Sequence, residues 1–101
     1  MGAPVFIGDE AAAAGFRLCG LRTVVPPRGE ELAALDLARA EAPLVLIDAA
    51  CASRVPRARL DAALAALAPL VLVIPDLRGG AAPADLVREV RAQLGLGGIE
   101  R

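Results

Sequence analysis

Acidic side chains follow two of the apolar runs that predict strands. Asp9 and Glu10 come just after Val5–Ile7, and Asp48 comes directly after residues 44–47. Because ligands of an open parallel sheet bind beyond the C-terminal ends of its strands, we expect these carboxylates to lie at one edge. Two carboxylates can hold Mg²⁺, and an aspartate can then accept a phosphoryl group. Phosphoryl transfer is therefore the first chemistry to consider.

This layout is similar to that of phospho-accepting receiver domains, so a degenerate receiver-like signalling regulator that uses Asp9, Glu10 and Asp48 is one alternative. Receivers also need a lysine after a fifth strand, but this chain has no lysine and four strand-like runs. Helix capping is a simpler explanation of Asp9 and Glu10, because a carboxylate at a helix N-terminus contributes about 0.3–1 kcal/mol. We therefore favour capping and expect no catalytic or metal-binding residue.

The composition excludes several other classes of site. The chain has no His, Lys, Trp, Tyr or Asn, which rules out a Ser-His-Asp triad, a histidine metal site, a P-loop lysine and a Schiff-base lysine. Gly8 alone does not make a phosphate cradle. The 11 basic and 12 acidic residues are scattered, with a net charge of −1, so nucleic acid is not an expected partner. We expect neither enzymatic activity nor a cofactor.

Cellular location can also be anticipated from the sequence. Cys19 and Cys51 match no metal-binding spacing and suit buried, reduced thiols. The longest apolar run, residues 62–74, contains Pro69 and is shorter than the roughly 18 residues of a membrane span. The N-terminus reaches acidic residues too early for a signal peptide. We expect a cytoplasmic protein with no membrane insertion.

Four runs rich in Val, Ile and Leu predict strands, at residues 5–7, 23–25, 44–47 and 70–74. The last two are apolar at every position, which is typical of strands covered on both faces. Helices are predicted between them, over residues 9–19, 29–41 and 53–67. This alternation predicts an α/β fold of three layers, with a four-stranded parallel sheet in the flavodoxin-like or receiver-like order 2-1-3-4.

Two helices carry more specific expectations. In the first, Gly15 is expected to permit close approach of the helix to the sheet, and Phe16 to anchor the core. In the third, Leu60, Leu64 and Leu67 recur at helical spacing and predict a buried stripe, and the cap expected for that helix is Ser53.

The C-terminal part is predicted to be a separate unit. Residues 1–78 form the globular α/β domain, residues 79–82 form a hinge around Gly79 and Gly80, and residues 83–101 form an amphipathic helix and tail. A helix of about 12 residues is too short to be stable alone in water, so it needs a surface to cover its apolar side. The apolar positions of that helix are Leu86, Val87, Val90 and Leu94.

The segment from Ile7 to Leu21 reads IGDEAAAAGFRLCGL. It resembles the N-terminal signature of the F subunit of V-type and A-type rotary ATPases, in which a strand and Asp-Glu are followed by a spacer and Gly-Phe-Arg-Leu-Ala-Gly. The later strands, Asp48 and the paired glycines fall in the family's order and spacing. Cys19 stands where alanine is usual.

The resemblance implies a non-catalytic rotor component in the central stalk of a proton- or sodium-translocating ATPase or ATP synthase, on the cytoplasmic face of the membrane. Such a protein binds the D subunit, which is the coiled-coil axle, and its C-terminal helix modulates ATP hydrolysis through transient contact with the catalytic head. On this basis the apolar positions of the last helix form a movable partner contact, and Arg88 and Arg91 meet acidic groups. Alternatively, this helix completes the second face of the sheet and never leaves it.

Overall fold

The computed structural model describes residues 3–75 and 83–93. Within these ranges one parallel sheet is built from β1 (Val5–Ile7), β2 (Arg22–Val24), β3 (Leu44–Asp48) and β4 (Leu70–Ile74). The strands lie in the order β2-β1-β3-β4, which confirms the predicted topology. β2 begins and ends one residue before the predicted strand.

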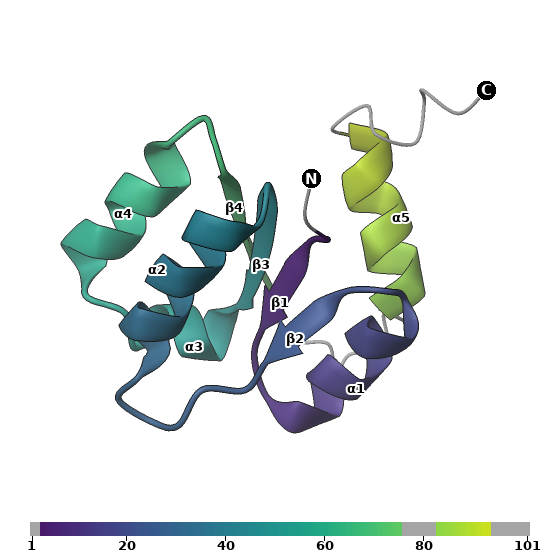
Figure 1. Cartoon of the computed structure of the whole chain (residues 1–101), viewed down its shortest axis with the longest axis horizontal. Helices are drawn as coiled ribbons and strands as arrows, with labels where there is room; N and C mark the ends of the chain where they lie inside the picture. The colour runs from purple at the N-terminus through teal and green to yellow at the C-terminus, as the bar shows by residue number, and fades with distance from the viewer. Residues whose placement is uncertain (1–2, 76–82, 94–101) are drawn as a thin grey trace.

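Helices cover both faces of this sheet (Figure 1). α1 (Glu10–Leu18) and α5 (Pro83–Gln93) lie on one face, and α2 (Glu31–Glu41), α3 (Ala49–Ser53) and α4 (Arg57–Ala65) lie on the other. The three-layer α/β fold is therefore confirmed. None of the helices in residues 3–75 and 83–93 is long and apolar enough to cross a bilayer.

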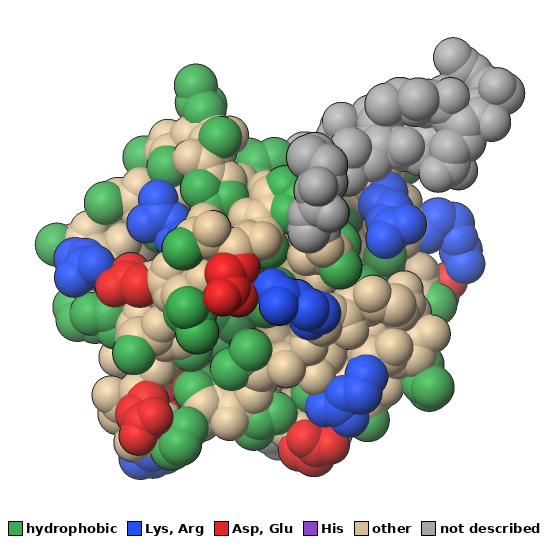
Figure 2. All heavy atoms as spheres, in the orientation of Figure 1, with side chains coloured by type: hydrophobic (Ala, Val, Ile, Leu, Met, Phe, Trp, Pro, Cys, Tyr) green, Lys and Arg blue, Asp and Glu red, His purple; other side chains and the backbone are tan. Residues whose placement is uncertain are grey.

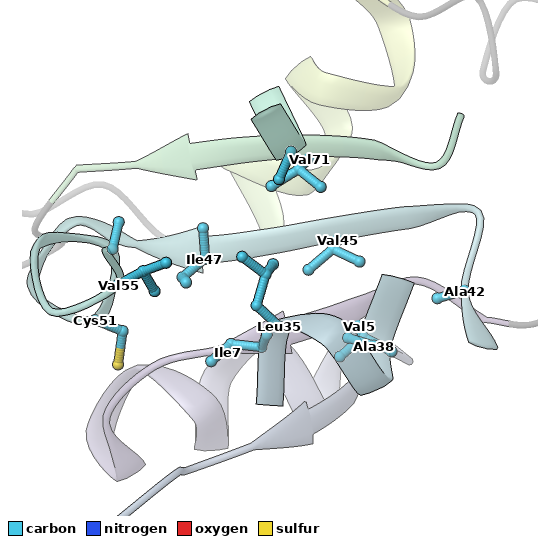
Figure 3. Close-up of a cluster of buried hydrophobic side chains, with 12 residues drawn as sticks. Val5, Ile7, Leu35, Ala38, Ala42, Val45, Ile47, Cys51, Val55 and Val71 are labelled. Carbon is cyan, nitrogen blue, oxygen red and sulfur yellow. The ribbon is translucent and has the colours of Figure 1, made fainter. Parts of the chain in front are cut away.

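The central strands are buried on both sides because their side chains alternate between two cores. Val45 and Ile47 of β3 point toward Leu35 of α2 in the cluster drawn in Figure 3. Leu44 and Leu46 belong to the other cluster, beneath α1 and α5. An uninterrupted apolar run is therefore required at β3, as expected for a strand between two helical layers.

α1 has the termini that its sequence predicts. The Asp9 side chain accepts a hydrogen bond from the backbone N–H of Ala12 at 2.9 Å, as an N-cap does. Gly20 follows the helix with φ of 92°, the left-handed conformation that glycine adopts most readily. Phe16 is fully buried and stacks on Phe6 with ring centroids 4.3 Å apart, which confirms its role in the core.

The predicted third helix is the part of the fold where the expectation was wrong. The region is split into α3 and α4, and Ser53 ends α3 instead of capping a longer helix, its hydroxyl donating to the carbonyl of Ala50. α4 ends at Ala65, so Leu67 lies beyond it and is 90% exposed. Leu64 is also exposed, whereas Leu60 packs against the core. In this nine-residue helix the fully buried residue is Ala63, so a small side chain, not a stripe of leucines, makes the closest contact with the core.

Candidate interaction site at the C-terminal helix

α5 is held against the domain by its apolar side. Leu86, Val87 and Val90 are partly buried and pack on the core cluster that contains Phe16 and Leu46. In this arrangement the domain itself supplies the covering surface that these three residues need. No side chain of α5 is fully buried between residues 83 and 92. The contact is therefore apolar but shallow.

The contact between α1 and α5 depends on a glycine. A Cβ atom added to Gly15 would lie 2.6 Å from Cγ of Pro83, the first residue of α5. The expectation that Gly15 allows close approach to the sheet was therefore wrong, because its near neighbour is another helix. Sequence spacing could not reveal this contact, since the two residues belong to helices from opposite ends of the chain.

An open groove of about 650 Å³ lies between the C-terminal end of α1 and α5. We call it the α1–α5 groove. Its α1 wall ends in Leu18, which is 90% exposed, and in the half-buried Cys19. The lining residues are Leu18, Cys19, Ala84, Val87, Arg88, Arg91 and Ala92.

The predicted arginines both line this groove. Arg88 donates to the Asp85 carboxylate one helical turn earlier, at 3.1 Å, with both side chains largely exposed. In Figure 2, basic side chains lie over the region of α5, next to apolar ones. Arg88 is exposed and Arg91 is half-buried, and both border the apolar residues of the groove. The other predicted residues, Leu94 and the hinge glycines Gly79 and Gly80, lie outside the described residues.

The acidic edge of the sheet is occupied by backbone groups. Asp48 caps α3 by accepting from the N–H of Cys51 at 2.7 Å, and its other oxygen accepts from the N–H of Asp9 at 3.2 Å. Glu10 is exposed and pairs with Arg17 at 3.5 Å. The structure does bring Asp9 and Asp48 together, but both carboxylates serve as helix caps. This arrangement favours capping over a phospho-accepting site.

Gly8 makes that acidic edge possible. A Cβ atom at Gly8 would lie 2.6 Å from Oδ2 of Asp48 and would overlap the ring of Phe6. Glycine is therefore needed here for space and not for a phosphate cradle. No group of three or more His, Cys, Asp or Glu side chains that could hold a metal ion occurs in residues 3–75 and 83–93.

Sequence reasoning missed an ion pair next to this edge. Glu31, in the first turn of α2, is 1% exposed and accepts a hydrogen bond from Nε of Arg54 at 2.6 Å. Its other oxygen accepts from the N–H of Gly29 at 2.9 Å. The Arg54 hydrogen bond holds the pKa of Glu31 below its ordinary value. The signal in the sequence was the glycine just before the helix, because Gly29 adopts a left-handed φ of 96° and supplies that N–H.

The two cysteines differ in environment. Cys51 is buried, as predicted, and burial, with the neighbouring Asp48 carboxylate, raises the pKa of its thiol to about 11. The expectation of a buried thiol was wrong for Cys19, which is only half-buried in the wall of the α1–α5 groove. Since the thiolate is the reactive form, Cys51 is a core residue and not a nucleophile.

These features define a class: an α/β domain of flavodoxin-like topology whose acidic strand ends cap helices and whose last helix borders an open groove. The chain matches the family described as the ATP synthase (F/14-kDa) subunit over residues 5–91, and it belongs to that family. It is thus a component of a rotary ATPase of the V/A type, a complex that transports ions. A comparison with curated proteins gave no match.

Proposed function

We propose that the chain is a non-catalytic rotor component of the central stalk, which binds the coiled-coil axle and modulates ATP hydrolysis through α5. Family membership supports a place in the rotary complex. The proposed partner and the proposed regulation are inferred from the side chains that α5 exposes. In this proposal the protein works at the cytoplasmic face of the membrane and takes no cofactor.

The shallow burial of α5 against the domain is the observation that supports the proposal. Phe16 of α1 and Leu35 of α2 are 0% and 1% exposed, whereas Leu86, Val87 and Val90 are only partly buried. Burial stabilises by roughly 25 cal/mol per Å² of apolar surface, so a helix with shallow burial gives up less when it leaves. A partner that covers the same residues can compensate for that loss.

The proposed movement turns about Gly79 and Gly80, with residues 1–78 as the globular domain and residues 83–101 as the moving unit. In the extended position, the apolar positions, Leu94 included, contact the catalytic head transiently. Arg88 and Arg91 then face acidic groups on the head or stalk. The competing possibility is a permanently docked α5 that only completes one face of the sheet.

Hydrolysis by the reconstituted motor separates these possibilities. We expect the double variant Leu86→Asp with Val90→Asp to change the rate of ATP hydrolysis. The two aspartates weaken the contact of α5 with the domain and also its contact with a partner. Leu37→Asp is the matched control, because Leu37 is 60% exposed on the opposite face. An unchanged rate with a folded, incorporated double variant would count against regulation through α5.

A further inference from the structure

The α1–α5 groove has walls from two separate elements. Leu18 and Cys19 come from the end of α1, and Val87, Arg88 and Arg91 come from α5. The groove therefore has its shape only while α5 is docked. A ligand that uses both walls would bind the docked state more tightly than the released one.

The apolar part of the groove includes a highly exposed leucine. Leu18 is 90% exposed in the last turn of α1, beside Cys19 and Val87. The nearby core does not need its side chain, because Phe16 and Leu21 already fill this end of the cluster. An exposed leucine next to a groove suits an apolar side chain from another surface.

The charged side chains that line the groove are basic. Among the residues that the structure describes, two arginines and no acidic residue line it. The pair of Arg88 with Asp85 has side chains 74% and 66% exposed, and such a pair contributes little and exchanges easily. Charge complementarity therefore points to a partner surface that carries carboxylates.

We propose that the α1–α5 groove binds the acidic, leucine-bearing face of a helix, and does so only while α5 is docked. This inference rests on the proposed function, in which that helix belongs to the coiled-coil axle. Partner binding then stabilises docked α5, and release of α5 weakens partner binding by the same factor. The docked helix is thus part of the attachment to the axle.

Charge reversal tests the arginines. The probe is the purified axle protein, and the measurement is its Kd for the full chain. We expect Arg88→Glu with Arg91→Glu to weaken binding about tenfold or more, and raised salt to weaken the wild-type complex. Arg28→Glu with Arg57→Glu is the matched control, since it makes the same change of charge at exposed positions away from the groove. The control is expected to bind as the wild type does.

Leu18 tests the apolar wall. Leu18→Asp is expected to weaken binding about tenfold or more. Leu67→Asp is its control, because Leu18 and Leu67 are both 90% exposed and Leu67 does not line the groove. Neither leucine is buried, so both variants should fold, which circular dichroism checks.

Cys19 reports the groove directly. We expect the bound axle protein to slow alkylation of Cys19 in the wild type, because the thiol lies in the groove wall.

Gly15→Ala tests the need for docked α5. The added methyl group crowds Pro83 and displaces α5, so we expect weaker binding of the axle protein.

The outcomes separate the inference from the proposed function. If the axle protein binds the wild type and both groove variants equally, the groove is not the docking site and only the inference fails. If it does not bind the wild type, the proposed function fails first and the inference with it. Concentration-dependent protection of Cys19 without the axle protein, together with a dimer mass, would assign the groove to a second copy and overturn the inference.

Discussion

Nε of Arg54 donates a hydrogen bond to Oε2 of Glu31 across 2.6 Å, although 23 residues separate the two along the chain. The bond joins the end of α3 to the start of α2. Arg54 also donates to the sulfur of Cys51. The N–H of Cys51 donates to the carboxylate of Asp48, which also accepts a hydrogen bond from the N–H of Asp9. A continuous set of polar contacts thus connects the C-terminal ends of β1 and β3 with the start of α2.

The Glu31 pair makes stability depend on pH in a defined direction. Its folded-state pKa lies below the ordinary value of 4.5, so the unfolded chain takes up the proton first as pH falls. The stabilisation is therefore complete at neutral pH and is lost as pH falls through the folded-state pKa. We expect Glu31→Gln to unfold at lower urea than the wild type at pH 7, and the difference to shrink in acid.

Glu30→Gln is the control for that measurement, since Glu30 is exposed at the adjacent position and makes no side-chain cap. It should leave the urea midpoint nearly unchanged at both pH values. A Glu31→Gln midpoint that differs from the wild type equally at neutral and acid pH would contradict the pair's role.

Phe16 should be a principal determinant of stability. Its ring is fully buried against Phe6, so Phe16→Ala removes a large side chain and leaves a cavity. We expect a loss of about 3–5 kcal/mol in the free energy of unfolding. Leu18→Ala, two residues later but exposed, should change it by less than about 0.5 kcal/mol. Equal effects of the two variants in urea titrations would show that the stacking is not a core contact.

The cysteines should react at very different rates. With a pKa of about 11 and a buried side chain, Cys51 has little thiolate at pH 8 and little access. We expect iodoacetamide to modify Cys19 in the native protein, and both residues only after unfolding in urea. Rapid native labelling of Cys51, located by peptide mass spectrometry, would contradict the packing of α3.

Gly15→Ala should release α5 without unfolding α1. Alanine is favoured over glycine in a helix by roughly 1 kcal/mol, so α1 itself should gain stability. The added methyl group nevertheless meets Pro83 at 2.6 Å, so α5 must shift. We expect faster alkylation of Cys19 than in the wild type or in Ala14→Ser, a control at an exposed neighbour. An unchanged rate would mean that α5 adjusts without leaving.

The strands and their order could be predicted because the signal is local. The apolar runs of β1 and β3 identify strands covered on both faces, and the alternation with helices restricts the topology. The same expectation was wrong for β4, an edge strand whose Val73 is exposed. Asp9 as a cap and Phe16 as a core residue followed from chemistry within one turn of helix.

The errors came from contacts between distant segments. Helical spacing suggested that Leu67 is buried, but spacing cannot show where a helix ends, and Ala65 ends α4. The burial of Glu31 depends on Arg54, and the role of Gly15 depends on Pro83, a residue of another helix. Such pairings are properties of the assembled fold and leave no periodic trace in the sequence.

Complex formation with the coiled-coil axle tests the central claim most directly. The full chain is coexpressed with the axle protein, and the mass of the purified product is measured by light scattering. We predict a complex of one copy of each chain, with Cys19 protected and Cys51 unreactive. A folded chain that elutes alone, with Cys19 alkylated at the rate of the isolated protein, would contradict the proposed function.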